Sequence, residues 1–323
     1  MTWALDDDDP GRAAAIALLP EVFYLFLDEH AGWMDRVLAR LPETHPLAAI
    51  CHAFAALWNT LRGDNAEALG VGRRGLQIED QLGGVAQRIL WWAISEAHLN
   101  TGDPVEGLAA ARRSLEAGGG SQTDIELVSP LELALQCALV AEPDAAQGFA
   151  ERLNAVAEIA PSDVNTAAAA TATGYVCLVR GDVDGALDRF RSTYELAAGI
   201  PHLQGEALRN LAVAASWSGS SGAAGVIAGA LDQLYRERMW SLVWVVVEAL
   251  TVYWGRGGRT TDAAVLVGYL ERHGLAHGLL VEGRRQVGVA VERLPAAEAR
   301  TRSGAAMSRD DLVSFALDGL RTT

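Results

Sequence analysis

The chain has 323 residues and a formal net charge of −15; half of its residues are hydrophobic and only 7% are aromatic. An acidic surface of this size argues against binding to a nucleic-acid backbone, which requires clustered positive charge, and equally against docking on anionic lipid. All 26 basic residues are arginine, so a Walker-type phosphate loop and a Schiff-base enzyme, which both need lysine, are excluded.

The N-terminal region predicts a helical hairpin in a cytoplasmic protein. The first residues, MTWALDDDDPGR, are acidic and lack the basic-then-apolar order of a signal peptide. The segment Gly11–Leu41 has the pattern of two helices, with an irregular turn expected near Asp28. The three cysteines lie far apart and form no C-x-x-C motif, which favours a reducing compartment; they are Cys51, Cys137 and Cys177.

A short motif then recurs along most of the chain. In VRGDVDGAL (179–187), Gly181 is followed by Asp182 and, five positions after the glycine, by Ala186. A constant period of 20–50 residues is typical of a stacked repeat architecture. The equivalent turns are spaced by 38 to 40 residues and lie at Gly63, Gly102, Ala141, Gly181, Gly219 and Gly258.

Each copy predicts a helix, a tight turn and a second helix. Glycine closes the first helix in a left-handed conformation, and the Asp, Ser or Thr after it can cap the second. Small residues are expected where the two helices cross. Five positions after the turns these are Ala68, Gly107, Ala146, Ala186, Ala224 and Ala263, and seven positions before them Ala56, Ser95, Ala134, Gly174, Ala212 and Thr251.

Other signals complete the predicted element list. Ser129-Pro130 and Ile200-Pro201 are expected to start helices, because proline suits the first helical turn. The most apolar run is 15 residues long and contains a glutamate, so it predicts a buried core helix, not a membrane span. No segment shows sustained strand alternation. The ranges concerned are 240–254 for the core helix, 117–124 and the Pro161 region for loose linkers, and Val281–Leu294 and Ser308–Leu320 for terminal helices.

The Gly-Asp-x-x-x-Ala core, with its small residue seven positions earlier, resembles the tetratricopeptide repeat, although the period exceeds the usual 34 by about five residues. Longer-period variants of this kind are similar to the helical-repeat region of large STAND-class ATPase and LuxR-type transcriptional regulators of actinobacterial type. Segment 5–42 resembles the start of that region, and segments 255–274 and 298–320 resemble its end.

This resemblance implies an all-α fold, a right-handed α-solenoid of about seven helical hairpins. The hairpins would occupy residues 1–280, and capping helices residues 281–323. It also implies a sensor or scaffold in signalling or transcription, either part of a larger regulator or free-standing. Possible partners are then an ATPase or DNA-binding module in cis or in trans. The sequence itself contains no phosphate loop and no recognisable helix-turn-helix.

Motifs that suggest chemistry fail in their context. GVGRRG (Gly70–Gly75) matches the dinucleotide glycine pattern but follows no predicted strand. His273 and His277 are four residues apart, but flanking glycines and the lack of nearby Cys or Asp favour a loop over a metal site. Cys137 and Cys177 occupy equivalent repeat positions, which indicates a packing role. We therefore expect no catalytic residue, metal or cofactor, although an enzyme with a helical-cavity site remains an alternative.

A groove is the favoured binding site. In tetratricopeptide-type stacks the first helices of the hairpins line a concave face, and an apolar floor with a few polar groups suits a peptide or small effector. Arg209 could pair with a ligand carboxylate. The residues of this chain at the groove-lining positions of such stacks are Trp92, Glu96, Asn100, Thr171, Tyr175, Glu206, Arg209, Ser216, Trp217 and Glu248.

Two alternatives remain open for these residues. Tryptophan and leucine at helical spacing often belong to a core, and another layer of the protein could cover this face. The stack could also be an assembly element that forms homo-oligomers or packs against other domains. The sequence leaves undecided whether the predicted groove is open, which ligand it binds and what the oligomeric state is.

Overall fold

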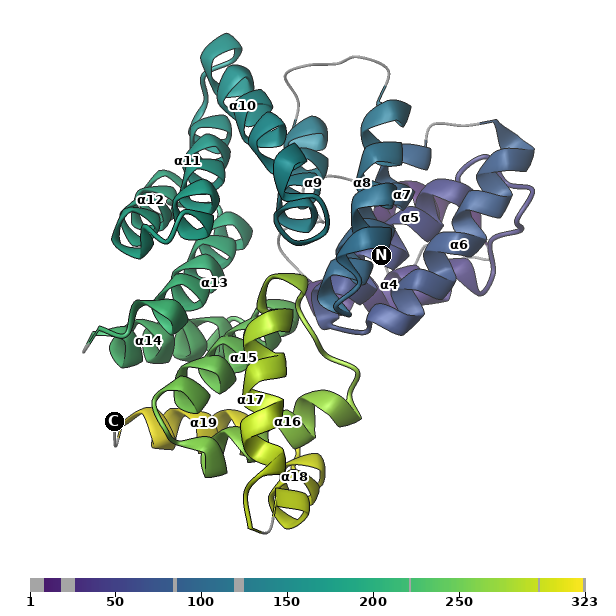
Figure 1. Cartoon of the computed structure of the whole chain (residues 1–323). Coiled ribbons are helices and arrows are strands. Elements are labelled where there is room, and N and C mark those ends of the chain that lie inside the picture. The colour runs from purple at the N-terminus through teal and green to yellow at the C-terminus, as the bar shows by residue number, and fades with distance from the viewer. Residues whose placement is uncertain are drawn as a thin grey trace. The chain divides into compact units, whose positions relative to one another are not determined.

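The computed structural model describes residues 9–18, 27–83, 86–118, 125–220, 222–295 and 297–321 (Figure 1). Within these ranges the protein is all-α, with 17 α-helices and one short 3-10 helix. The α-helices are α2 Pro10–Ala17, α4 Leu27–Leu38, α5 Ala48–Arg62, α6 Asn65–Leu82, α7 Gln87–Asn100, α8 Pro104–Ala117, α9 Ile125–Ala141, α10 Pro143–Ile159, α11 Asp163–Val179, α12 Val183–Leu196, α13 Pro201–Ser218, α14 Ala223–Arg236, α15 Trp240–Arg256, α16 Thr260–Arg272, α17 Val281–Glu292, α18 Ala297–Ala305 and α19 Arg309–Arg321, and the 3-10 helix is η1 Gly278–Leu280.

The chain divides into two compact units. The first comprises Met1–His98 and Val105–Ala134, and the second comprises Leu99–Pro104 and Leu135–Thr323. This division falls inside α9, whereas the expected boundary between repeats and capping helices, at residue 280, lies within the second unit. In both units consecutive helices pack in pairs, as a helical repeat requires.

The predicted turns are present between these pairs. Five of the six turn positions are glycines with φ between 62° and 83°, the left-handed conformation that ends a helix without steric cost. The sixth, Ala141, is the last residue of α9, and Glu142 follows in a non-helical conformation. We call the helix before each turn the A helix and the helix after it the B helix, so that α11, α13 and α15 are A helices.

Small residues lie where the A and B helices meet. The six residues seven positions before the turns are all buried. In the second hairpin Ser95 Oγ donates a hydrogen bond to the carbonyl of Gly107 at 2.8 Å, so the two small positions touch directly. In the hairpin after Gly219 the buried alanine is Ala223, and the expected Ala224 is only half-buried. The crossing there is shifted by one residue.

Helix capping follows the prediction in part. Asp182 Oδ1 accepts a hydrogen bond from the Gly185 backbone N–H at 3.0 Å and so caps α12. The equivalent Asp64 makes no capping bond to α6; its carboxylate pairs with Arg62 at 3.1 Å.

One expected helix boundary is wrong and one is confirmed. Pro130 lies inside α9, which begins at Ile125; a proline so near the helix start removes one backbone hydrogen bond while the apolar pattern continues. Asp28 lies in the first turn of α4, and residues 19–26, where the turn expected near Asp28 could fall, lie outside the described ranges. Pro201 is the first residue of α13, with Ile200 as its N-cap, as predicted. Most of the expected linker at 117–124 lies outside the described residues.

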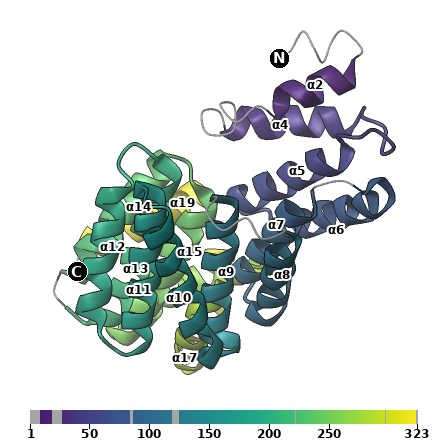
Figure 2. The same ribbon diagram turned by 90° about the horizontal axis from the view of Figure 1, so that it is seen from above.

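The C-terminal helices pack around the last hairpins of the second unit. Helix α17 contacts α15 and α16, α18 contacts α16, and α19 contacts α14 and α15. Figure 1 shows α17 and α18 beside α16, and Figure 2 shows α19 next to α14. Tyr235 of α14 donates a hydrogen bond to Asp310 of α19 at 2.9 Å.

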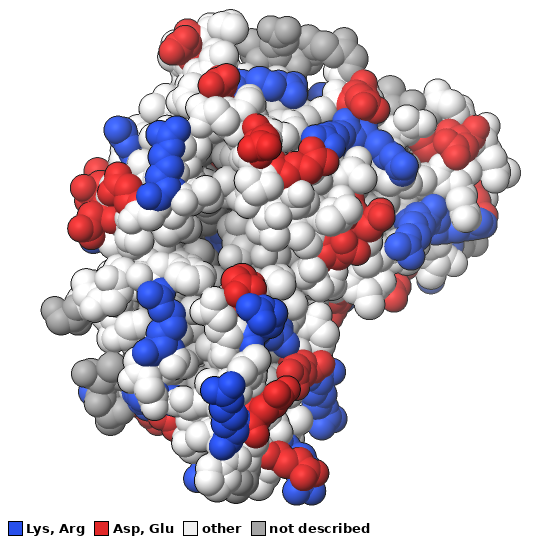
Figure 3. All heavy atoms as spheres, in the orientation of Figure 1, with Lys and Arg blue, Asp and Glu red and all other residues white. Residues whose placement is uncertain are grey.

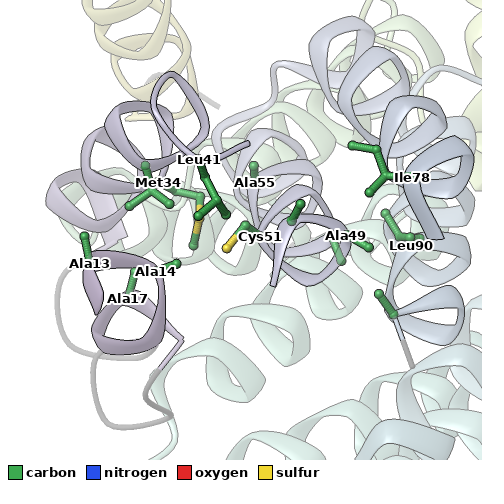
Figure 4. Packing of buried hydrophobic residues seen from close by; sticks show 14 residues of the cluster. Ala13, Ala14, Ala17, Met34, Leu41, Ala49, Cys51, Ala55, Ile78 and Leu90 are labelled. Carbon is green, nitrogen blue, oxygen red and sulfur yellow. The ribbon is translucent and has the colours of Figure 1, made fainter. Parts of the chain in front are cut away.

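The cores are rich in alanine. Figure 4 shows the cluster of the first unit, in which Met34 and Leu41 lie between α2 and α5, and Ile78 lies next to Leu90 on the other side of α5. Cys51 is part of this cluster, and burial raises the pKa of its thiol to about 12, which keeps it protonated. Helix α15 is buried from Ser241 to Val252, and no helix in the described ranges is long and apolar enough to cross a bilayer.

A matched pair of alanines in α6 tests whether small residues are required at the helix crossings. Ala68 is completely buried, whereas Ala66 in the same turn is exposed. Because leucine cannot fit between closely packed helices, Ala68→Leu should lower the free energy of unfolding by about 2 kcal/mol, and Ala66→Leu by less than about 0.5 kcal/mol. Urea denaturation of the full chain measures both, and equal effects would contradict the proposed crossing geometry.

Candidate functional site

Polar side chains gather in the second unit on three successive A helices and on the segment that follows α16. Their hydrogen bonds and ion pairs form two sets, one around Arg209 and one around Glu248, and most of the side chains are buried. The charge of Arg209 acts on His277 of the second set. We call the two sets together the polar cluster and the helix surface that carries it the A-helix face. Its members are Tyr175, Glu206, Arg209, Asn210, Glu248, His277 and Arg284.

Arg209 lies at the centre of the cluster. Its Nη2 donates to the Tyr175 hydroxyl at 3.1 Å, its Nε donates to Asn210 Oδ1 at 3.1 Å, and its Nη2 also pairs with Glu206 at 2.5 Å. The Tyr175 hydroxyl in turn donates to Asn210 Oδ1 at 2.7 Å. The Arg209 side chain is 6% exposed and that of Glu206 is 24% exposed, so the carboxylate lies on the solvent side of the guanidinium.

The hairpin packing places these groups. Glu206 and Arg209 are three residues apart on α13 and therefore face the same side of that helix. Tyr175 comes from the neighbouring A helix α11, where its ring meets the edge of Phe190 from α12, with centroids 5.3 Å apart. Gly174 leaves room for that phenylalanine. Apolar packing of the ring thus fixes the position of the Tyr175 hydroxyl, which accepts the hydrogen bond from Arg209.

The segment Leu275–Arg284, which we call the strap, joins the cluster from outside the repeat. The His277 backbone N–H donates to Glu248 Oε2 of α15 at 2.6 Å. Arg284 Nη1 donates to the carbonyl of Leu275 and lies 3.6 Å from Glu248 Oε1. Leu280 of the strap packs in an apolar cluster with Val213, Val245, Ala249 and Val252.

Helix α17, whose first residues belong to the strap, continues this cover. A side chain at Gly283 would contact Val252 of α15 and Trp217 of α13, and Val287 packs directly against Gly255. The chain's own residues therefore cover the A-helix face of α15. Glu248 binds the strap and does not line an open surface. On α15, therefore, another layer of the protein covers the face where the groove was predicted.

Burial dominates the electrostatics of Glu248 and His277. Burial raises the pKa of Glu248 to about 7, although Arg284 and the His277 N–H both oppose the shift. Burial, together with the positive charge of Arg209, lowers the pKa of His277 well below its usual value. The His277 ring is therefore neutral at pH 7.

Two buried polar atoms of the cluster lack hydrogen-bond partners within the described ranges: Glu248 Oε1 and His277 Nε2. His277 Nδ1 accepts from the Leu279 N–H at 3.4 Å, so in the neutral ring Nε2 carries the proton. This Nε2–H is a buried donor with no acceptor. Such groups cost free energy and are commonly satisfied by water or a ligand.

Four of the ten residues predicted for the groove belong to the cluster: Tyr175, Glu206, Arg209 and Glu248. The other two from α13 lie close by. Ser216 Oγ donates to the carbonyl of Val213 within the helix, and the Trp217 ring lies 4.9 Å from the Arg256 guanidinium carbon.

The remaining predicted residues lie elsewhere. Thr171 is hydrogen-bonded to Thr193 of α12 at 3.2 Å, so it lies between the helices of its hairpin. Trp92 packs in the first unit against the buried cluster of Ala56, Leu57 and Ala93. Glu96 is half-buried on the same helix, α7. Asn100 ends α7, and its backbone carbonyl accepts from the Ala276 N–H at 3.2 Å.

Three members of the cluster were not predicted from the sequence. Asn210 directly follows Arg209, and a hydrogen-bond acceptor beside a buried arginine is the signal that could have identified it. His277 and Arg284 lie beyond the last regular turn, where the repeat period gives no position. His273, the other histidine considered for a metal site, is exposed and stacks on Tyr269 with centroids 4.4 Å apart.

On the face drawn in Figure 3, acidic and basic side chains are interspersed. In the part of the chain that the structure describes, no group of three His, Cys, Asp or Glu residues is arranged to bind a metal ion. Comparison with protein-family models gave no match, and neither did comparison with curated proteins. The geometry of the cluster therefore carries the functional argument.

Replacing Glu248 with glutamine should change how stability depends on pH. The folded-state pKa of about 7 lies above the ordinary 4.5, so this group stabilises the fold fully below pH 4.5 and loses that contribution as pH rises to 7. The change amounts to about 3 kcal/mol. Urea denaturation should show Glu248→Gln gaining about this much over the unmodified protein between pH 4.5 and 7.5; parallel curves would contradict the raised pKa.

His277→Asn should have the opposite effect. The folded-state pKa of His277 is lowered, so its contribution to stability is present above pH 6.5 and is lost as pH falls, because the unfolded chain takes up the proton. Relative to the variant, the unmodified protein should lose stability as pH falls below 6.5, by at most about 1.4 kcal/mol per pH unit. A constant difference between the two curves below pH 6.5 would exclude a neutral buried His277.

Proposed function

We propose that the chain is a tetratricopeptide-like helical-repeat module, with its hairpins stacked as a right-handed α-solenoid. It acts as a non-enzymatic sensor or scaffold of a cytoplasmic signalling or transcriptional regulator. The A-helix face binds a peptide segment of a protein partner or a small effector. An ATPase or DNA-binding module, in cis or in trans, would receive the signal.

The observation that carries this proposal is the arrangement around Arg209. Binding sites combine apolar walls with a few fixed polar groups, and Arg209 is fixed by Tyr175, Asn210 and Glu206 beside the apolar cluster that includes Val213. The bonds within the cluster do not pair a hydroxyl or thiol nucleophile with a base. This arrangement favours recognition over catalysis.

The repeat provides a way to transmit binding. Each hairpin packs mainly against its neighbours, so a ligand that contacts both α11 and α13 changes the relative free energies of different stacking arrangements. The strap extends this connection, because it contacts Glu248 on α15 and leads directly into α17. A change at Arg209 can therefore affect the C-terminal helices through contiguous packing.

An assembly role is the second candidate, and the cover on α15 favours it. Helix α17 packs along the A-helix face of α15, with Val287 against Gly255. The face is therefore able to accept a helix, and a helix from another subunit or domain could bind to neighbouring A helices in the same way. In that case the module would form a defined oligomer or a permanent interdomain interface.

A binding screen tests the first candidate. A metabolite panel and a displayed peptide library should yield a ligand whose affinity falls about tenfold or more in Arg209→Ala. Arg191→Ala should have no effect, because Arg191 is exposed on α12. Calorimetry measures the affinities. If ligands are found whose affinity is the same in Arg209→Ala, the A-helix face is not the binding site, and a tight oligomer in sedimentation that buries this face would favour assembly instead.

A further inference from the structure

We propose that Arg209 anchors a carboxylate-binding subsite in which Glu206 occupies the place of the ligand's carboxylate until the ligand binds. This inference rests on the proposed binding function and names the chemical class of its ligand. The class is a monocarboxylic acid with an apolar body, either a small molecule or the free C-terminus of a peptide.

The first argument is the order of burial. The guanidinium of Arg209 is almost completely buried, whereas the Glu206 carboxylate that pairs with it is partly exposed. A ligand that approaches from solvent therefore meets Glu206 first and reaches Arg209 by replacing it. Because the pair belongs to one helix turn, Glu206 can move outward through rotation of its side chain without a change of the backbone.

The second argument is preorganisation. The Arg209 Nε and Nη2 atoms also bind Asn210 and Tyr175, which are both buried and neutral. These bonds do not involve Glu206, so the guanidinium keeps its orientation when the carboxylate leaves. An arginine fixed in this way presents a planar set of donors that matches a carboxylate and loses little side-chain entropy on binding.

The third argument is the unsatisfied donor of His277. Its Nε2–H is buried without an acceptor in the described part of the chain, and the positive charge of Arg209 contributes to lowering the pKa of this ring. The strap that carries His277 packs through Leu280 on Val213, one turn after Arg209 on α13. An acceptor group on a ligand could satisfy the buried Nε2–H.

The charge balance sets the class of anion. The described cluster contains two arginines, Arg209 and Arg284, and Arg284 is already engaged with the strap through Leu275 and Glu248. Arg209 is the guanidinium that a ligand reaches by displacing Glu206, and one guanidinium suits a single negative charge better than a phosphate monoester. The chain as a whole carries a net charge of −15, which also disfavours polyanions.

The neighbouring side chains define the rest of the ligand. Leu178 lies three residues after Tyr175 on α11, and Val213 lies four residues after Arg209 on α13, so each shares a helix side with a polar anchor. Leu178 and Trp217 are half-buried and pack on the same apolar cluster. A carboxylate at Arg209 would thus place an apolar or aromatic body beside these side chains.

Titration of the full chain with defined acids tests the inference. The probes are hexanoate, phenylacetate and indole-3-acetate, and, as a separate arm, a tetrapeptide ending in leucine with a free or an amidated C-terminus. Calorimetry and amide NMR spectra follow binding. We expect saturable binding of at least one free carboxylate and none of its amide; the arm that binds more tightly identifies the source as a small acid or a peptide terminus.

The variants separate the roles of the two residues. Glu206→Gln removes the internal competitor and should tighten binding about tenfold, whereas Arg209→Gln should abolish it. Arg209→Lys keeps the charge but loses the planar donor set, and it should bind about tenfold more weakly or worse. The matched control is the exposed pair of the same spacing on α12, for which Asp188→Asn and Arg191→Gln should leave binding unchanged.

Several outcomes would overturn the inference. They are weaker binding in Glu206→Gln, undiminished binding in a folded Arg209→Gln or Arg209→Lys protein, and no binding of any free carboxylate to either the unmodified chain or Glu206→Gln. The last result leaves the proposed function standing if the screen finds another ligand that depends on Arg209. If no ligand of any class depends on Arg209, both proposals fail together.

Discussion

The close crossing of the two helices in each hairpin is the constraint on which the rest of the structure depends. Ser95 touches the backbone of Gly107, and Ala186 and Ala263 are completely buried at the equivalent place. Small side chains allow the two helix backbones to approach closely. The contact then leaves little space for a larger side chain. This repeated contact sets the rotation of every A helix, and thereby decides which of its residues face the next A helix.

The rotation of the A helices does not by itself decide what a residue does. Thr171, Arg209 and Glu248 all lie ten residues before their turns, yet the first bonds to α12, the second to α11 and its own helix, and the third to the strap. The element that packs against each position differs along the chain. A repeat can therefore place chemically different groups at one structural position and build a single asymmetric site from them.

Local chemistry determined which features could be predicted from the sequence. The glycine turns and the start of α13 at Pro201 follow from backbone preferences of single residues, and they are found as expected. The helix start predicted at Pro130 was wrong, because the apolar pattern of α9 continues through this residue. The position of the strap depends on Leu280 and Gly283 fitting against α15 and Trp217, a long-range match that no local period encodes. Arg209 was identified by its repeat position, but its partner Asn210 was not.

The cluster also shows why polar groups are retained inside an alanine-rich repeat. With Glu248 ionised, two arginines face two glutamates, so the cluster is neutral in sum, but its geometry is imperfect: Arg284 lies 3.6 Å from Glu248 and one carboxylate oxygen has no hydrogen bond. An apolar replacement of such buried groups is often more stable. What the polar groups provide is direction: the Glu248 carboxylate accepts the N–H of one particular residue of the strap, and Arg209 has one orientation. These bonds add to the apolar fit of Leu280 and Gly283 against α15, and together the two kinds of contact fix the strap beside the site.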